Sequence, residues 1–146
     1  ITAIAKVVPM DSYQPLRTAL IAACQTNIEN VKILVEHGVD INYTETKYNM
    51  QNALVTAFQH KKIDVIKYLI VDLKINTENI EYTARDGEII EIRTYLRQLV
   101  YGLKSEDYKT KMKIVNYLME QKINYWEYPV PRNMYHNYSP HFLKMY

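Results

Sequence analysis

Residues 28–42 read I-E-N-V-K-I-L-V-E-H-G-V-D-I-N, and this stretch decides the fold of the chain. Four of its apolar residues recur at i, i+3, i+6 and i+7, the spacing of one helix face: Ile28, Val31, Leu34 and Val35. Gly38 follows that face, and glycine most easily adopts the left-handed conformation in which many helices end. The stretch therefore predicts a short amphipathic helix followed by a tight turn.

The same apolar pattern occurs twice more along the chain. Its second and third copies are Ile63, Ile66, Leu69, Ile70 and Met112, Val115, Leu118, Met119. A shorter pattern, spaced i, i+3, i+4, precedes each copy: Leu20, Ala23, Cys24, then Leu54, Ala57, Phe58, then Leu96, Leu99, Val100. Each copy therefore predicts a pair of short helices. A pair this small cannot bury its own apolar face, so we expect the pairs to stack and share one core.

Two stretches of the chain resemble the repeat unit of the ankyrin family. Residues 18–42 read T-A-L-I-A-A-C-Q-T-N-I-E-N-V-K-I-L-V-E-H-G-V-D-I-N, and residues 52–76 read N-A-L-V-T-A-F-Q-H-K-K-I-D-V-I-K-Y-L-I-V-D-L-K-I-N. Their closing asparagines, Asn42 and Asn76, are 34 residues apart, close to the family period of about 33. The resemblance implies an all-α fold, an ankyrin-like solenoid of stacked antiparallel helix pairs. The second copy departs from the family pattern because Asp72 stands where the closing glycine is expected.

The repeats predict a single domain over residues 1–146. We place its parts at about 13–42, 47–76 and 86–124 for the repeats, with an N-terminal cap or partial repeat at 1–12. In the third repeat we expect a long helix over 88–101 and an exposed loop at 104–113 that merges into the last repeat helix. Residues 125–146 hold three of the five prolines and many aromatic residues. This composition predicts either a C-terminal cap that folds back over the stack or a docking tail for another chain.

Composition and charge narrow the class of protein. The chain has 146 residues, of which 48% are hydrophobic, and a net charge of only +2, which does not predict a nucleic-acid or membrane partner. The single cysteine, Cys24, favours a reducing, intracellular and cytoplasmic setting. Diverged ankyrin arrays rich in Lys, Asn, Ile and Tyr are familiar from large DNA viruses, protists and intracellular bacteria. For a viral or bacterial protein the setting is the cytoplasm of the host cell.

The titratable residues form no catalytic or metal-binding pattern. The four histidines, His37, His60, His136 and His141, and Cys24 do not have the spacing of a zinc site. The three glycines make no phosphate-binding loop. Lys109, Lys111 and Lys113 lie near acidic residues, so we expect solvated surface charge there. We therefore predict no enzyme activity, no metal and no cofactor.

Partner contacts are expected where the family makes them, on the first helices and the projecting fingers that line the concave face. Carried over to this sequence, the expected contact residues are Gln14, Arg17, Gln25, Tyr48, Asn49, Gln51, Gln59 and His60, with Trp126 and Tyr128 from the tail. Two functions fit. One is a non-catalytic module that binds another protein through its concave face, loops and aromatic tail. The other is a structural or targeting subunit of a larger assembly, for example a viral one, held through the C-terminal tail.

Overall fold

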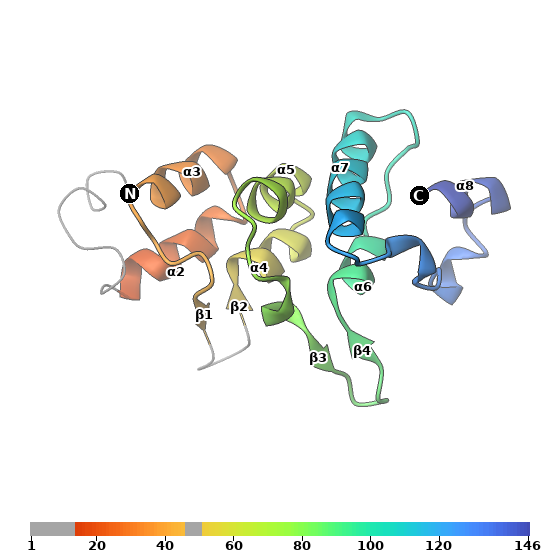
Figure 1. Ribbon diagram of the computed structural model, residues 1–146, viewed down its shortest axis with the longest axis horizontal. Coiled ribbons are helices and arrows are strands. Elements are labelled where there is room, and N and C mark those ends of the chain that lie inside the picture. The colour runs from red at the N-terminus through yellow and green to blue at the C-terminus, as the bar shows by residue number, and fades with distance from the viewer. Residues whose placement is uncertain (1–13, 46–50) are drawn as a thin grey trace. The chain divides into compact units, whose positions relative to one another are not determined.

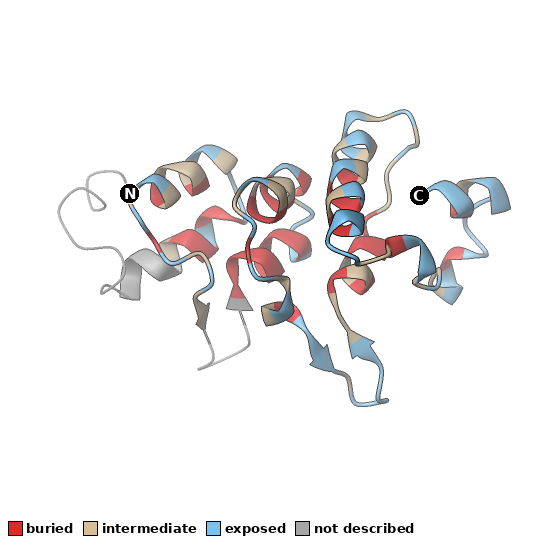
Figure 2. Cartoon of the chain, viewed as in Figure 1, coloured by how far each residue is buried: buried red, intermediate tan, exposed pale blue. Residues whose placement is uncertain are grey.

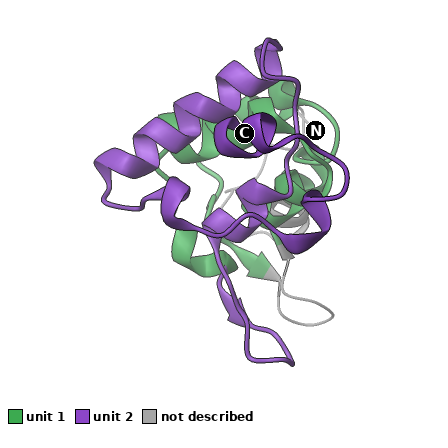
Figure 3. Ribbon diagram, turned by 90° about the vertical axis from the view of Figure 1, so that its right-hand side faces the viewer, with its two compact units in different colours: residues 1–80 green, residues 81–146 purple. Residues whose placement is uncertain are grey.

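The computed structural model describes residues 14–45 and 51–146, and all their side chains except those of residues 14–18, 45 and 51 (Figure 1). The chain divides into two compact units, residues 1–80 and residues 81–146 (Figure 3). We describe each unit by itself. A single domain over residues 1–146 stays a prediction.

Unit 1 is built from two helix pairs. Its helices are α2 (Gln14–Ala23), α3 (Ile28–Glu36), α4 (Ala53–Gln59) and α5 (Ile63–Lys67), followed by the π-helix η1 (Tyr68–Asp72) and the short 3-10 helix η2 (Thr77–Ile80). Helix α2 packs against α3, and α4 packs against α5. The pairs also contact each other, because α2 touches α4 and α3 touches α5. The prediction of stacked helix pairs is confirmed for the first two copies.

The core of unit 1 contains the apolar residues that the two patterns predict (Figure 2). From the shorter pattern, all six residues are buried: Leu20, Ala23, Cys24, Leu54, Ala57 and Phe58. From the longer pattern, Val31, Leu34, Ile63, Ile66, Leu69 and Ile70 are buried, whereas Ile28 and Val35 are half-buried. Each fully buried side chain of this size contributes about 1.5–3 kcal/mol to folding.

The helix α3 begins and ends as the sequence predicts. At its start the side chain of Asn27 accepts a hydrogen bond of 2.7 Å from the amide of Glu29. At its end Gly38 has a φ of 85°, in the left-handed region, and its amide donates to the carbonyl of Val35 over 2.9 Å. The predicted role of Gly38 is confirmed.

The second copy ends its helix without a glycine. The amide of Leu73 donates to the carbonyl of Tyr68, five residues earlier, so the last turn widens into the π-helix η1. Lys74 then takes the left-handed conformation with a φ of 54°. A lysine therefore occupies a backbone conformation that costs it free energy and would cost a glycine almost none.

Each unit also has a two-residue antiparallel strand pair. In unit 1, β1 (Thr44–Glu45) pairs with β2 (Gln51–Asn52), and Thr44 lies opposite Asn52. In unit 2, β3 (Tyr82–Thr83) pairs with β4 (Ile89–Ile90), and Gly87 in the turn has a φ of 90°. The β1–β2 pair belongs to the connection between the first two repeats, where the family resemblance implies a finger. No finger was predicted at β3–β4, where a helix was expected from residue 88.

Unit 2 contains one long helix, several short helical segments and the tail. Its helices are α6 (Ile92–Arg97), α7 (Glu106–Glu120), the 3-10 turns η3 (Tyr125–Glu127) and η4 (Arg132–Met134), and α8 (Pro140–Met145). The predicted long helix over 88–101 is wrong, because Ile89 and Ile90 belong to strand β4 and the helix has only six residues. The predicted loop at 104–113 is wrong from Glu106 onward. Ser105 caps α7 by accepting from the amide of Tyr108 over 3.1 Å, so the helix begins at Glu106.

The buried face of α7 shares only two residues, Val115 and Leu118, with the predicted one. Its buried residues are Lys111, Ile114, Val115 and Leu118, spaced i, i+3, i+4 and i+7. Met112 is half-buried, and Met119 is 41% exposed. The offsets i, i+3, i+6 and i+7 fit this helix only in part because its inward face includes the long side chain of Lys111.

Candidate functional site

Three of the predicted contact residues are exposed on unit 1. Gln25 follows the last turn of α2, and Gln59 and His60 occupy the end of α4. Gln25 and Gln59 occupy equivalent positions in consecutive repeats, and the helices that carry them are in contact. Both glutamines therefore lie at or just beyond the carboxyl ends of first helices that contact each other. The ring of His60 is oriented by a 3.1 Å hydrogen bond between its Nδ1 and the carbonyl of Thr56.

The other predicted contacts of unit 1 are not placed by the structure. Tyr48 and Asn49 lie outside the described residues. Gln14 and Arg17 belong to α2, and Gln51 belongs to β2, but their side chains are outside the description.

Asn52, which sequence reasoning missed, fixes the base of the first finger. Its side chain is buried; Oδ1 accepts from the amide of Val55 over 2.9 Å, and Nδ2 donates to the carbonyl of Asn79 over 3.4 Å. The residue thus caps α4 and ties the second strand of the finger to η2. An asparagine directly before the second apolar pattern was a usable N-cap signal in the sequence.

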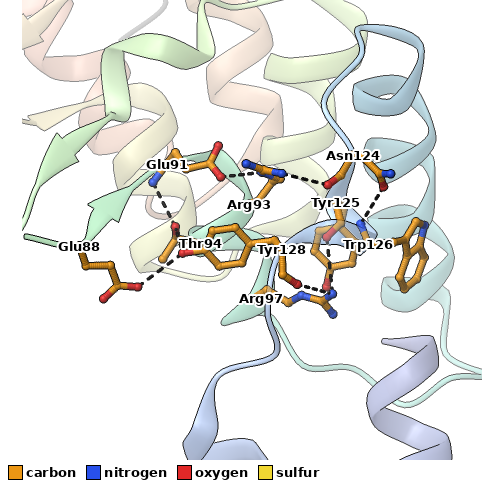
Figure 4. A network of polar contacts seen from close by, with 9 residues as sticks. All are labelled: Glu88, Glu91, Arg93, Thr94, Arg97, Asn124, Tyr125, Trp126 and Tyr128. Atoms are coloured by element: carbon orange, nitrogen blue, oxygen red, sulfur yellow. Dashed lines mark hydrogen bonds and ion pairs between the residues drawn. The ribbon is translucent and has the colours of Figure 1, made fainter.

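The two predicted tail residues lie on the turn that follows α7. Trp126 is 41% exposed, with its ring edge-on to Tyr125 at 5.0 Å between centres. Tyr128 is half-buried, and its hydroxyl accepts a 2.7 Å hydrogen bond from the hydroxyl of Thr94 on α6 (Figure 4). The same hydroxyl lies 3.5 Å from a carboxylate oxygen of Glu88. Trp126 is therefore available to a partner, whereas Tyr128 mainly holds the tail to the hairpin and α6.

Arg97 lies at the centre of the tail contacts and was not predicted. It is only 3% exposed, and its guanidinium lies over the rings of Tyr125 and Tyr146, 4.2 and 5.3 Å from their centres. Its Nη2 donates to the carbonyl of Tyr128 over 3.0 Å, whereas Nε and Nη1 have no hydrogen-bond partner. No described carboxylate pairs with it. Its position within the apolar pattern of α6 was the only sign in the sequence.

Lys111 is a second buried cation in unit 2, and the prediction of solvated charge is wrong for it. It is 1% exposed, and its Nζ donates to the main-chain oxygens of Leu99 and Tyr146 over 2.8 and 2.7 Å. The ring centres of Tyr125 and Tyr146 lie 5.2 and 4.6 Å away. Burial lowers the pKa of Lys111 to about 7, and the charge of Arg97 acts in the same direction.

A groove of about 920 Å³ opens within unit 2. It is bounded by the β3–β4 turn and strand β4, by α6, and by residues 128–134 of the tail. Its apolar lining includes Ile90, Val130 and Met134. Its charged lining residues are Glu88, Arg97 and Arg132.

Comparison with known families identifies the repeats. A family model described as ankyrin repeats (3 copies) matches residues 5–81, which is more than half of the chain. The chain belongs to the ankyrin-repeat family. Ankyrin repeats are generally protein–protein interaction modules, and domains built from them are generally non-catalytic. No curated protein and no solved structure gave a significant match.

The ankyrin match has limits that bear on the site. It includes most of the segment predicted as a cap or partial repeat at 1–12, and it ends at Glu81, at the start of unit 2. The predicted third repeat at 86–124 and the groove therefore lie outside it. Within residues 14–45 and 51–146, no group of three His, Cys, Asp or Glu side chains has the arrangement of a metal site. In the same part of the chain, no helix is both long enough and apolar enough to cross a membrane.

Proposed function

We propose that this ankyrin-repeat chain is a non-catalytic module that binds a protein partner through the first-helix ends and fingers of unit 1. The observation that carries the proposal is the equivalence of Gln25 and Gln59. Both are exposed, Gln59 as the last residue of α4 and Gln25 two residues after the end of α2, and α2 and α4 are in contact. Stacked repeats thus present the same polar group at regular intervals, which suits recognition of an extended surface.

The rest of the proposed surface follows from the same repeat period. Tyr48, Asn49 and Gln51 occupy in the second repeat the positions that Gln14, Pro15 and Arg17 occupy in the first. With one exception the proposed contact residues are uncharged. We therefore propose that the partner is recognised by hydrogen bonds and aromatic contacts, with little contribution from long-range electrostatics.

Trp126 extends the proposed contacts to the tail. Tryptophan is enriched among the residues that contribute most to binding energy at protein interfaces. The partly exposed ring of Trp126 rests against Tyr125, which is fully buried. The ring is therefore held in place before a partner arrives, which lowers the entropy cost of binding. Most of the other aromatic residues of the tail serve the packing of unit 2 itself.

Site-directed photo-crosslinking tests the proposal. A photoreactive amino acid is placed at Gln25 or Gln59, and for comparison at Glu29 or Glu36, two exposed positions on the second helix α3. In the native cell, one protein should crosslink to both glutamine positions and to neither glutamate position. Equal crosslinking from all four positions, or from the glutamate positions alone, would contradict the proposed surface.

A further inference from the structure

We infer that the groove of unit 2 is a second protein-binding site, which takes a short peptide segment carrying a carboxylate side chain between apolar residues. The site lies outside the matched repeats and does not depend on the surface proposed for unit 1. It is formed entirely by residues 87–134.

The size and walls of the groove favour an apolar segment. A volume of about 920 Å³ is near the upper end of the range of about 300–1,000 Å³ in which proteins bind ligands. Ile90 and Val130 are half-buried on its walls, and Pro129 and Pro131 stiffen the tail side. Apolar side chains placed there would leave water, at a gain of about 25 cal/mol per Å².

The charge of the lining favours a carboxylate. Arg132 is exposed and forms no ion pair within the described part of the chain. Arg97 also borders the groove, but its guanidinium is buried among carbonyl oxygens and aromatic rings, so it adds positive charge behind the wall and is not itself a contact for the ligand. Glu88 is the one lining carboxylate, and it already lies beside the hydroxyl of Tyr128. Two arginines against one glutamate leave the groove complementary to a negative group.

The polar lining favours a peptide over a compact anion. Gln98 and Asn133 are exposed at the groove, and their amides can donate to and accept from a peptide main chain. A phosphate ion would contact exposed Arg132 but would leave the apolar walls in water. A peptide with one acidic side chain between two apolar ones can contact the apolar walls, the positive charge and the side-chain amides of the groove.

The test is an NMR titration of the isotope-labelled full chain with two matched peptides, acetyl-Leu-Glu-Leu-amide and acetyl-Leu-Gln-Leu-amide. The glutamate peptide should shift amide signals of residues 87–98 and 128–134. It should bind about three- to fivefold more tightly than the glutamine peptide, the effect of one partly exposed ion pair. Inorganic phosphate, as a third probe, should bind more weakly than the glutamate peptide.

Two arginine variants complete the test. Because Arg132 is exposed, Arg132→Gln should leave the fold intact and remove the preference for the glutamate peptide. Arg85→Gln, at an exposed arginine outside the groove lining, should retain that preference. The inference is overturned by any of four results: equal binding of both peptides, tighter binding of phosphate, equal effects of the two variants, or no shifts in the groove at about 10 mM peptide.

Discussion

The side-chain oxygen of Asn42 accepts a 3.2 Å hydrogen bond from the main-chain amide of Asn76, the residue at the same position one repeat later. Asn76 in turn accepts from the amide of Glu78 over 2.8 Å. Asn124, the residue that closes the predicted third copy, accepts likewise from the amide of Trp126 over 3.1 Å. The side chains of Asn76 and Asn124 thus shape the turns that follow them, whereas that of Asn42 links two consecutive repeats.

Replacing Asn42 by alanine should weaken this link. The change removes the acceptor of the Asn76 amide, and a lost hydrogen bond of this kind costs about 0.5–1.5 kcal/mol in the free energy of unfolding. Urea denaturation followed by circular dichroism measures the effect. The control is Asn30→Ala on helix α3, where alanine has the higher helix propensity and no loss is expected. An equal loss in both variants would show that the link between repeats contributes nothing.

The left-handed positions at the helix ends give a pair of opposite predictions. Gly38→Ala should destabilise unit 1 by about 1 kcal/mol, because its φ of 85° is unfavourable for a residue with a Cβ. Lys74→Gly should stabilise the same unit by up to about 1 kcal/mol, since its φ of 54° is easier for glycine. Gly102→Ala is the control: its φ is not in the left-handed region, and a Cβ there meets no atom within 4 Å. In thermal denaturation the melting temperature should be lowest for Gly38→Ala, intermediate for Gly102→Ala and highest for Lys74→Gly.

Buried Lys111 predicts a pH dependence for unit 2. Its pKa falls from 10.5 to about 7 on folding, so between these values the unfolded chain binds more protons than the folded one. The free energy of unfolding should therefore rise from about pH 7 to about pH 9.5. Above that range the tyrosines oppose the rise, because burial raises the pKa of Tyr125 and Tyr146 in the folded state.

Trp126, the only tryptophan, makes this rise measurable by fluorescence during denaturation of unit 2. Lys111→Met should remove most of the rise, whereas Lys113→Met, at an exposed lysine on the same helix, should keep it. A rise of the same size in both variants would show that another group causes it.

Arg97 should stabilise the packing of the tail, residues 125–146, within unit 2. Arg97→Met removes the hydrogen bonds to the turn at 125–128 and the contact with the Tyr125 ring, at a cost of about 1–3 kcal/mol. Part of the loss is offset because methionine carries no buried charge. The Trp126 signal should report earlier unfolding in urea, and Arg85→Met should match the unsubstituted chain. A stabilised Arg97→Met variant would show that the buried charge costs more than its contacts return.

The sequence predicted the features of the fold that depend on periodic apolar residues. The two helix pairs, their buried faces and the turn at Gly38 followed from helical spacing and from the conformational freedom of glycine. The missing glycine at Asp72 was visible in the sequence, but the widening of the last turn into the π-helix at 68–72 was not predicted from it. Lys111 and Arg97 were also missed. A charged side chain in an apolar pattern looks exposed until the tail supplies the carbonyl oxygens and rings that surround it.

For the proposed binding surfaces too, the sequence predicted the part that follows from the repeat and missed the part that does not. Exposure of Gln25, Gln59 and His60 follows from their places at the ends of the first helices, so repeat alignment was sufficient to find them. The groove could not be found this way. It joins a hairpin, a six-residue helix and an irregular tail, and none of these has a periodic pattern from which their contacts can be inferred.

The affinity of a double variant tests the central claim, recognition of a partner by equivalent positions of consecutive repeats, most directly. Titration calorimetry with the partner found by crosslinking should compare Gln25→Ala/Gln59→Ala with Glu29→Gln/Glu36→Gln. All four positions are exposed, so both variants should keep the melting temperature of the unsubstituted chain. We predict a loss of affinity of about tenfold or more for the glutamine pair. The glutamate pair should show almost no loss. Equal affinity of the two variants would contradict the claim.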